Sequence, residues 1–514
     1  MPFRFLLNFF QNNFYRYYKK HNPRFLSHSY LTKQKFLSFY RCEVSAWIGV
    51  QNNNFKTYNN RKFHTSSSEY RQIRRVLQQL YPGGKEVRYA KSIEESIFVT
   101  SKYLKKRIPV YSASLGKDEL FSNFDLLIPS KNSDSWSIVS VKSQVSFKKE
   151  NLTELAYQKL VAEKFGLNIE DVLLYTINSD YFYRKKIEVH KIFIKNSLIK
   201  KIDGEFQNAI EICNKYFQTI HSKTLPKNLE TCKTPIGCSN KDICFPDLKD
   251  GNVFDLREGK SLSKELYKSG IIYLKDIPSE TELTHKQLVQ VQCERTGKEH
   301  IKIENIERFC RDITYPLYFL DFETINPAIP LFKKSKPFQH IPTQFSLHVK
   351  LSKESPLLHH SFLLRNKKDP RKKILKHLEK LISSTGKIIV YDAVFERRCL
   401  NESVELYPEF KDWWEKVSKN IIDISLPFKS FHYYNPIQKG HASLKAVLPA
   451  LTGLDYNSLV IHNGGEANQE FYKYLTTKMS WLEKKKLRQN MEEYCKMDTY
   501  ALVEILNSLE KLLI

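Results

Sequence analysis

The segment PLYFLDFET, residues 316–324, decides the fold of the C-terminal half of the chain. The three residues before its first acid, YFL, are apolar and typical of a buried strand. Asp321 and Glu323 are two residues apart, so on a strand their side chains leave the same face and can share a cation. Burying two carboxylates costs free energy unless a metal or protonation neutralises them. A solvent-exposed strand end is the ordinary alternative for this pair taken alone.

Two later segments carry further acids beside predicted regular structure. In GKIIVYDAVFERRCL, residues 386–400, the run IIVY predicts a strand directly ahead of the acids. In EEYCKMDTYALVEIL, residues 492–506, the pattern predicts a helix on which a Tyr and an Asp stand four apart and share one face. The residues singled out are Asp392, Phe395, Glu396, Tyr494 and Asp498. Each of these residues by itself has an ordinary structural explanation. Their occurrence together in one sequence is much harder to explain by structure alone.

The combined pattern resembles the DEDD superfamily of 3′-5′ exonucleases, which have an RNase H-like fold and use two divalent metals. The superfamily's Asp-x-Glu motif is matched by Asp321 and Glu323, and its Tyr-x-x-x-Asp motif by Tyr494 and Asp498. Because Glu493, and not His, stands five before the last Asp, the match is to the tyrosine subclass.

The middle motif of that superfamily, Asn-x-x-Phe-Asp, is matched with two departures. Asp392 stands at the Asn position and Glu396 at the metal-binding Asp, while Phe395 agrees. Glu is one methylene longer than Asp and can still ligate. The resemblance implies Mg²⁺ or Mn²⁺ as cofactor, an attacking water oriented by Tyr494, and four ligands. These ligands are Asp321, Glu323, Glu396 and Asp498.

The charge balance points to a polyanionic partner. The 514 residues include 82 Lys and Arg against 56 Asp and Glu, a formal net charge of +26. Such a field attracts nucleic acid, either DNA or RNA, ahead of a membrane surface. No apolar run approaches the roughly 20 residues that a membrane span needs, so no membrane is expected as a partner.

A group of cysteines predicts a metal or cluster site in the first half. Cys232, Cys238 and Cys244 lie in TCKTPIGCSNKDICFP with five residues between successive cysteines, a spacing typical of ligation. Cys42 resembles the early cysteine that RecB-like nucleases of CRISPR systems pair with a late three-cysteine group. That resemblance implies a [4Fe-4S] cluster held by the four cysteines, and tetrahedral Zn²⁺ is the alternative.

Between these cysteines the sequence resembles the PD-(D/E)XK nuclease signature. Asp125 and Lys142 match the metal-binding acid and the lysine, and Gln158 matches the glutamine of RecB-like domains. Ser140, however, stands where the signature requires Asp or Glu. Since a hydroxyl cannot replace a carboxylate charge, we expect this site to be inactive and its residues to be relics that leave a nucleic-acid-binding role.

The chain as a whole is predicted to be α/β with several domains, since it is too long for one core. We expect a basic leader or arm over 1–29, a RecB-like domain over 30–250, a helical connector over 251–310 and an RNase H-like domain over 311–514. This order resembles a bacterial family of unassigned function, through stretches such as FHYYNPIQKGHASLKAVLPAL. Four residues in or near the shared stretches receive no role: Gln344, His348, Asp423 and Lys445.

The N-terminal leader leaves two locations open. The first 42 residues contain no acid, because Glu43 is the first. A basic arm on a cytoplasmic protein and a mitochondrial transit peptide both fit this composition.

Two functions fit the whole sequence. The first is a metal-dependent 3′-5′ exonuclease on single-stranded DNA or RNA, joined to an inactive RecB-like binding domain. The alternative is a non-enzymatic nucleic-acid-binding protein in which both nuclease sites have decayed. The intact acids of the second half favour the enzyme, while Ser140 shows how decay could look.

Overall fold

The chain forms two compact units, Met1–Tyr181 with Lys186–Cys232, and Phe182–Lys185 with Lys233–Ile514. The computed structural model describes residues 30–51, 67–87, 92–226, 232, 235 and 237–514. The predicted boundary at residue 250 differs from this division, because the helices after Cys232 belong to the second unit. The predicted leader over 1–29 lies outside the described residues. Within the described residues, no helix has the length and apolar character needed to cross a membrane.

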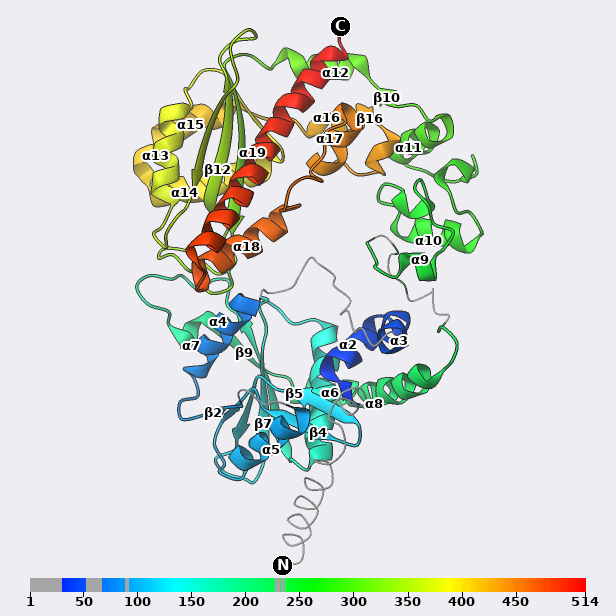
Figure 1. Ribbon diagram of the computed structural model, residues 1–514, viewed down its shortest axis with the longest axis vertical. Helices are drawn as coiled ribbons and strands as arrows, with labels where there is room; N and C mark the ends of the chain where they lie inside the picture. The colour runs from blue at the N-terminus through cyan, green and yellow to red at the C-terminus, as the bar shows by residue number, and fades with distance from the viewer. Residues whose placement is uncertain (1–29, 52–66, 88–91, 227–231, 233–234, 236) are drawn as a thin grey trace, which may run out of the picture. The chain divides into compact units, whose positions relative to one another are not determined.

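The first unit is built on a six-stranded mixed sheet and a small three-stranded sheet (Figure 1). The larger sheet has the order β2 (Lys85–Glu86), β3 (Val110–Tyr111), β6 (Leu126–Pro129), β7 (Trp136–Val141), β8 (Ile169–Ile177) and β9 (Phe193–Ser197). The smaller has the order β1 (Leu31–Thr32), β5 (Leu120–Asn123) and β4 (Ser114–Lys117). The helices are α2 (Lys33–Arg41), α3 (Glu43–Gln51), α4 (Ser67–Gln78), α5 (Ile93–Leu104), α6 (Lys149–Phe165), α7 (Val189–Ile192) and α8 (Ile199–His221).

Strands β6 and β7 of the first unit form an antiparallel hairpin, and the chain passes from β7 through helix α6 into β8, which lies parallel to β7. Every residue of β7 is buried, as in a strand that is covered on both faces. Helix α6 ends at Gly166, whose φ of 106° is the left-handed conformation that a helix terminator needs. Most residues of α6 are buried, and the helix packs against strand β8.

The second unit begins with a small helical region. It contains α9 (Lys241–Cys244), α10 (Lys260–Lys268) and α11 (His285–Thr296), with two 3-10 turns at Val253–Asp255 and Leu274–Asp276. It has a small core of its own, which comprises Val253, Leu256, Leu266, Leu274, Ile277 and Val291. Helix α12 (Ile303–Arg311) and the two-stranded ladder β10 (His300–Ile301) with β16 (Tyr433–Tyr434) lead into the main sheet.

A five-stranded mixed sheet organises the rest of the second unit. Its order is β13 (Leu358–Leu363), β12 (Ile341–Lys350), β11 (Leu317–Ile325), β14 (Lys387–Val390) and β15 (Ile421–Asp423). Strand β11 runs antiparallel to β12 and parallel to β14, so the acid-bearing strand is central and buried. One face is covered by α13 (Arg371–Leu381), α14 (Ala393–Leu406) and α15 (Lys411–Val417).

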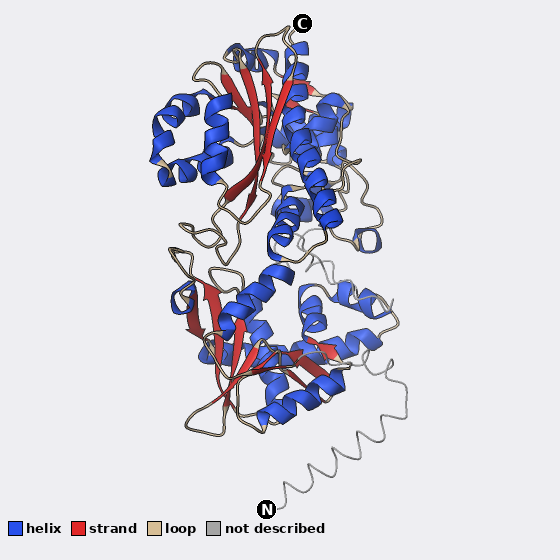
Figure 2. Ribbon diagram, turned by 60° about the vertical axis from the view of Figure 1, so that its left-hand side comes forward, coloured by secondary structure: helices blue, strands red, loops and turns tan. Residues whose placement is uncertain are grey.

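The other face of this sheet carries the long helix α19 (Trp481–Lys511) (Figures 1 and 2). Helices α17 (Leu444–Thr452) and α18 (Gly464–Thr476) lie on the same side, and α16 (Leu426–Lys429) precedes β16. Helix α19 starts at a capping box between Ser480 and Glu483 and includes the predicted helix of residues 492–506. The protein is thus mixed α/β, as predicted.

Candidate metal centre

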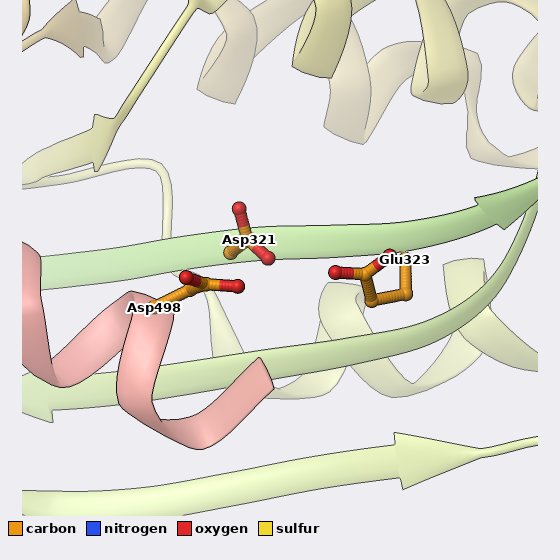
Figure 3. Close-up of side chains that lie close together, drawn as sticks. All are labelled: Asp321, Glu323 and Asp498. Atoms are coloured by element: carbon orange, nitrogen blue, oxygen red, sulfur yellow. The ribbon is translucent and has the colours of Figure 1, made fainter. Parts of the chain in front are cut away.

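Three carboxylates meet where α19 crosses the central strand. Asp321 and Glu323 project from β11 and Asp498 from α19, and one carboxylate oxygen of each lies within 4.8 Å of the others (Figure 3). Glu323 and Asp498 are buried, and Asp321 is partly buried. The two-residue spacing on the strand therefore does place both acids on one face, beside the acid predicted on the helix.

A fourth acid, Glu396 of α14, lies near this cluster. It lies in the first turn of α14, is 3% exposed and faces the charges of Asp321 and Glu323. Its Oε2 atom is buried and meets no hydrogen-bond partner among the described residues. A buried carboxylate oxygen without a hydrogen-bond partner is expected for a metal ligand, because the cation takes the place of a donor. The donor set, four carboxylates with an unpaired oxygen, fits Mg²⁺ or Mn²⁺.

The start of α14 is a tight turn held by Asp423. Asp392 precedes the helix with a φ of 76°, a left-handed conformation that Asn and Asp adopt more readily than other residues with a side chain. Asp423 on β15 accepts backbone hydrogen bonds from Asp392 at 3.2 Å and Ala393 at 3.3 Å. The left-handed backbone therefore suits Asp as well as Asn at position 392, and Asp423 holds the turn that precedes Glu396.

Burial and mutual repulsion disfavour ionisation of the four acids. Burial, followed by the charge of a neighbouring carboxylate, raises the pKa of Asp321, Glu323 and Glu396 well above the ordinary range. Burial also raises the pKa of Asp498, to about 6, against the opposing effects of a hydrogen bond from Tyr456 and the charge of Lys445. Without an added cation the cluster therefore holds protons near neutral pH.

A tyrosine and lysine group flanks Asp498. Tyr456 donates a hydrogen bond to Asp498 Oδ1 at 2.7 Å, and Lys445 Nζ donates one to Tyr494 Oη at 3.0 Å. Lys445 Nζ also lies 4.7 Å from the ring centre of Tyr456 and 4.6 Å from that of Tyr494. Cys495 Sγ lies 3.7 Å from Asp321 Oδ2 as a weak donor. The predicted Tyr494 thus lies at the cluster, and its hydroxyl accepts a hydrogen bond from Lys445.

The first unit contains a second buried acid site around Asp125. Its carboxylate accepts hydrogen bonds from Ser140 Oγ at 3.1 Å, from the Val141 backbone at 2.9 Å and from the Tyr70 hydroxyl. Ser140 therefore acts as a donor to the acid, where a second carboxylate would have repelled it. All of these donors come from the unit itself.

Lys142, predicted as a relic of the nuclease site, is paired with Glu154 of α6. Its Nζ lies 2.8 and 2.7 Å from the two oxygens of Glu154, and Lys33 Nζ lies 3.3 Å from one of them. Burial opposes ionisation of Glu154, but the two lysines outweigh burial and lower its pKa to about 2. Burial likewise opposes the charge of Lys142, yet Glu154 and Asp125 raise its pKa. The pair is ionised and self-compensating.

The remaining predicted residues have mainly structural contacts. Gln158 on α6 donates to the Asn123 carbonyl at 2.9 Å, and Gln344 on β12 donates to the Met491 carbonyl at 2.9 Å. His348 Nδ1 lies 2.8 Å from Thr499 Oγ1. These contacts join helix to sheet in each unit.

The cysteine prediction is not tested by the fold. Cys42 and Cys232 belong to the first unit, whereas Cys238 and Cys244 belong to the second. The carboxylate triad is the group of metal-ligating side chains found among the described residues, and it contains no cysteine. The [4Fe-4S] cluster and its zinc alternative stay predictions, which the iron and zinc content of purified protein would decide.

Sequence reasoning missed Glu154 and Tyr456. Glu154 stands four residues before Gln158 on a mostly buried helix, and an acid at such a position signals a buried partner. Tyr456 follows α17 in a loop and gives no local signal.

The comparisons place the chain near proteins without an assigned function. Residues 318–443 match a family model described as a domain of unknown function, DUF2779. The match includes Asp321, Glu323 and Glu396 and ends before Tyr494 and Asp498. The uncharacterized protein MG366 of Mycoplasma genitalium is 24% identical over 216 residues, which are 38% of this chain and 32% of that protein. The chain thus spans about a third of the length of this relative.

Proposed function

We propose that the second unit is a metal-dependent phosphodiester hydrolase of the DEDD 3′-5′ exonuclease type, with an RNase H-like fold, acting on single-stranded DNA or RNA. The observation that carries the proposal is a cluster of four acids, with Lys445 as the cation that lies near them: Asp321, which is partly buried, and Glu323, Glu396 and Asp498, which are buried. Four carboxylates so placed beside one lysine call for added positive charge at neutral pH. A helix-covered mixed sheet with acids on its central strand supports the same assignment.

The residues of the site have distinct tasks in this proposal. Asp321, Glu323, Glu396 and Asp498 would hold Mg²⁺ or Mn²⁺, which when bound supplies an activated water and stabilises charge on the leaving oxygen. Tyr456 holds Asp498 in place through its 2.7 Å hydrogen bond. Tyr494 orients the attacking water, as the resemblance implies. The first unit contributes nucleic-acid binding through a RecB-like domain whose acid site is self-compensated.

End-labelled oligonucleotides test this function. Single-stranded DNA and RNA carrying a 5′ label should shorten progressively from the 3′ end in Mn²⁺ or Mg²⁺, and should stay intact in EDTA. Asp321→Asn keeps the size of the side chain but removes its charge, so hydrolysis should fall by several orders of magnitude while binding survives. Asp412→Asn, an exposed position on α15, is the matched control and should keep full activity.

The competing function is binding without hydrolysis. If neither wild type nor Asp321→Asn degrades any substrate, or if both degrade substrates equally, the binding-protein alternative replaces the nuclease. Immediate release of a labelled mononucleotide would instead reverse the polarity of the proposed enzyme.

A further inference from the structure

Lys445 has contacts that a solvated surface lysine lacks. It stands in the first turn of α17, and its Nζ donates to the Tyr494 hydroxyl at 3.0 Å and to the backbone carbonyl of His462. The ring centres of Tyr494 and Tyr456 lie 4.6 and 4.7 Å from the same atom. The ammonium is therefore held between two aromatic rings, a carbonyl and a phenol oxygen.

These contacts fix the direction in which the Tyr494 hydroxyl can donate. A lysine ammonium has donors and no acceptor, so in this hydrogen bond the phenol oxygen must accept. The hydroxyl proton of Tyr494 must then point away from Lys445. Tyr494 and Asp498 are four residues apart on α19, and the Asp498 carboxylate accepts a hydrogen bond from the Tyr494 side chain, so the hydroxyl proton points to the carboxylate cluster.

We propose that Lys445 is a positioning residue for the hydrolysis assigned to this site, acting by fixing the rotation of the Tyr494 hydroxyl. The inference rests on the proposed function, because it concerns the water that Tyr494 would orient. A hydroxyl that rotates freely donates toward the reacting water only part of the time, and a pre-set one costs no reorganisation during reaction.

A different role for Lys445 predicts a different pattern of effects. Its charge also acts on Asp498, Glu323 and Asp321, so it could serve only as a counter-charge for the carboxylates. A counter-charge would matter equally with Tyr or Phe at position 494. A residue that acts through the Tyr494 hydroxyl has nothing left to position once that hydroxyl is gone.

A double-mutant cycle separates these roles. Lys445→Met and Tyr494→Phe should each lower kcat by roughly 10–100-fold with KM nearly unchanged. The double variant should be no slower than about threefold below the slower single variant. Lys473→Met, which removes an exposed lysine on α18, is the matched control and should keep the wild-type rate. If the two effects multiply, or if Lys445→Met alone is silent, the positioning role is overturned.

A spectroscopic measurement adds a readout independent of turnover. In protein labelled with 3-fluorotyrosine, the fluorine resonance that disappears in Tyr494→Phe belongs to residue 494. That resonance should shift in Lys445→Met and stay in place in Lys473→Met, whereas an unchanged resonance in Lys445→Met would overturn the contact. If wild type is active and the effects of the two substitutions on kcat multiply, only the positioning role of Lys445 is contradicted. If wild type is inactive, both the proposed nuclease and the positioning role are contradicted.

Discussion

The two acid sites of the chain differ in where their compensating charge comes from. In the first unit, Glu154 is held by Lys142 and Lys33, and Asp125 accepts three hydrogen bonds. In the second unit, four carboxylates face one another with Lys445 as the nearby cation. Both sites are buried acids on an α/β scaffold. The first is electrically complete as folded, whereas the second becomes complete only with protons or metal.

This difference teaches how a nuclease-like site can lose its need for metal. At position 140 a hydroxyl donor replaces the carboxylate that the resembling signature requires, and the lysine of that signature pairs with an acid from a helix. The number of lysines per buried carboxylate is then what distinguishes the first site from the proposed metal centre of the second. If this contrast holds, substitutions at the two acid sites should have different effects.

The largest effect on stability should come from breaking the self-compensated pair. Glu154→Gln leaves Lys142 and Lys33, which are 23% and 21% exposed, beside a neutral amide. This should destabilise the first unit by roughly 3 kcal/mol, the lower end for a buried pair, because both lysines still reach solvent. Glu163→Gln, at the end of the same helix, should cost less than about 1 kcal/mol because Glu163 is exposed and its partner Lys159 also pairs with Asp203. In EDTA, Glu396→Gln should leave the second unit as stable as wild type or more so, since it replaces a buried carboxyl whose ionisation is disfavoured by an uncharged amide of the same size.

Hydrogen exchange resolves these effects by unit. Peptides from α6 should exchange faster in Glu154→Gln, and peptides from α19 should not exchange faster in metal-free Glu396→Gln. Equal destabilisation by both substitutions would erase the contrast between the sites.

A smaller effect is an opposite response of the two units to pH. Asp498 has a pKa raised from 3.8 to about 6, so in metal-free protein its contribution to stability is full below 3.8 and is lost as pH rises through 6. Glu154 has a pKa lowered from 4.5 to about 2, so its contribution is full above 4.5 and is lost as pH falls through 2. Unit-resolved exchange without added metal should therefore show α19 less protected at pH 8 than at pH 4, and α6 less protected at pH 2 than at pH 5.

Metal should cancel the pH response of the second unit. Mg²⁺ or Mn²⁺ competes with protons for the carboxylates, so it should stabilise α19 more at pH 8 than at pH 5. The same response in α6 would contradict a self-compensated first site.

The smallest effect should be that of Lys142→Ala on hydrolysis. Since Lys142 neutralises Glu154 and has no role at the second site, activity per folded molecule should remain within about twofold of wild type. A hundredfold loss with the fold and nucleic-acid binding intact would show that the first site is a working nuclease.

Local patterns predicted what neighbours along the chain determine. The spacing of Asp321 and Glu323 fixed their common face, and the apolar run before them fixed a buried strand. Tyr494 and Asp498 followed from helical periodicity in the same way. Each of these predictions concerns residues that lie within a few positions of one another in the sequence.

Contacts between distant segments escaped sequence reasoning. Lys142 and Glu154 meet because α6 folds back on the end of β7, and Lys445 meets Tyr494 because α17 packs beside α19. A single sequence holds no record of such pairings. The left-handed backbone at Asp392 was equally invisible, since Asp occurs in many conformations and no glycine marks the turn.

Binding of Mn²⁺ to the purified full chain tests the central claim most directly. Calorimetric or electron-spin titration should find saturable Mn²⁺ binding in wild type and in Glu154→Gln, but not in Asp321→Asn at the same concentrations. Losing an outer-shell partner already costs about 10–100-fold in metal affinity, so losing Asp321 should cost more. Equal binding by wild type and Asp321→Asn, or binding abolished by Glu154→Gln in folded protein, would contradict a metal centre in the second unit alone.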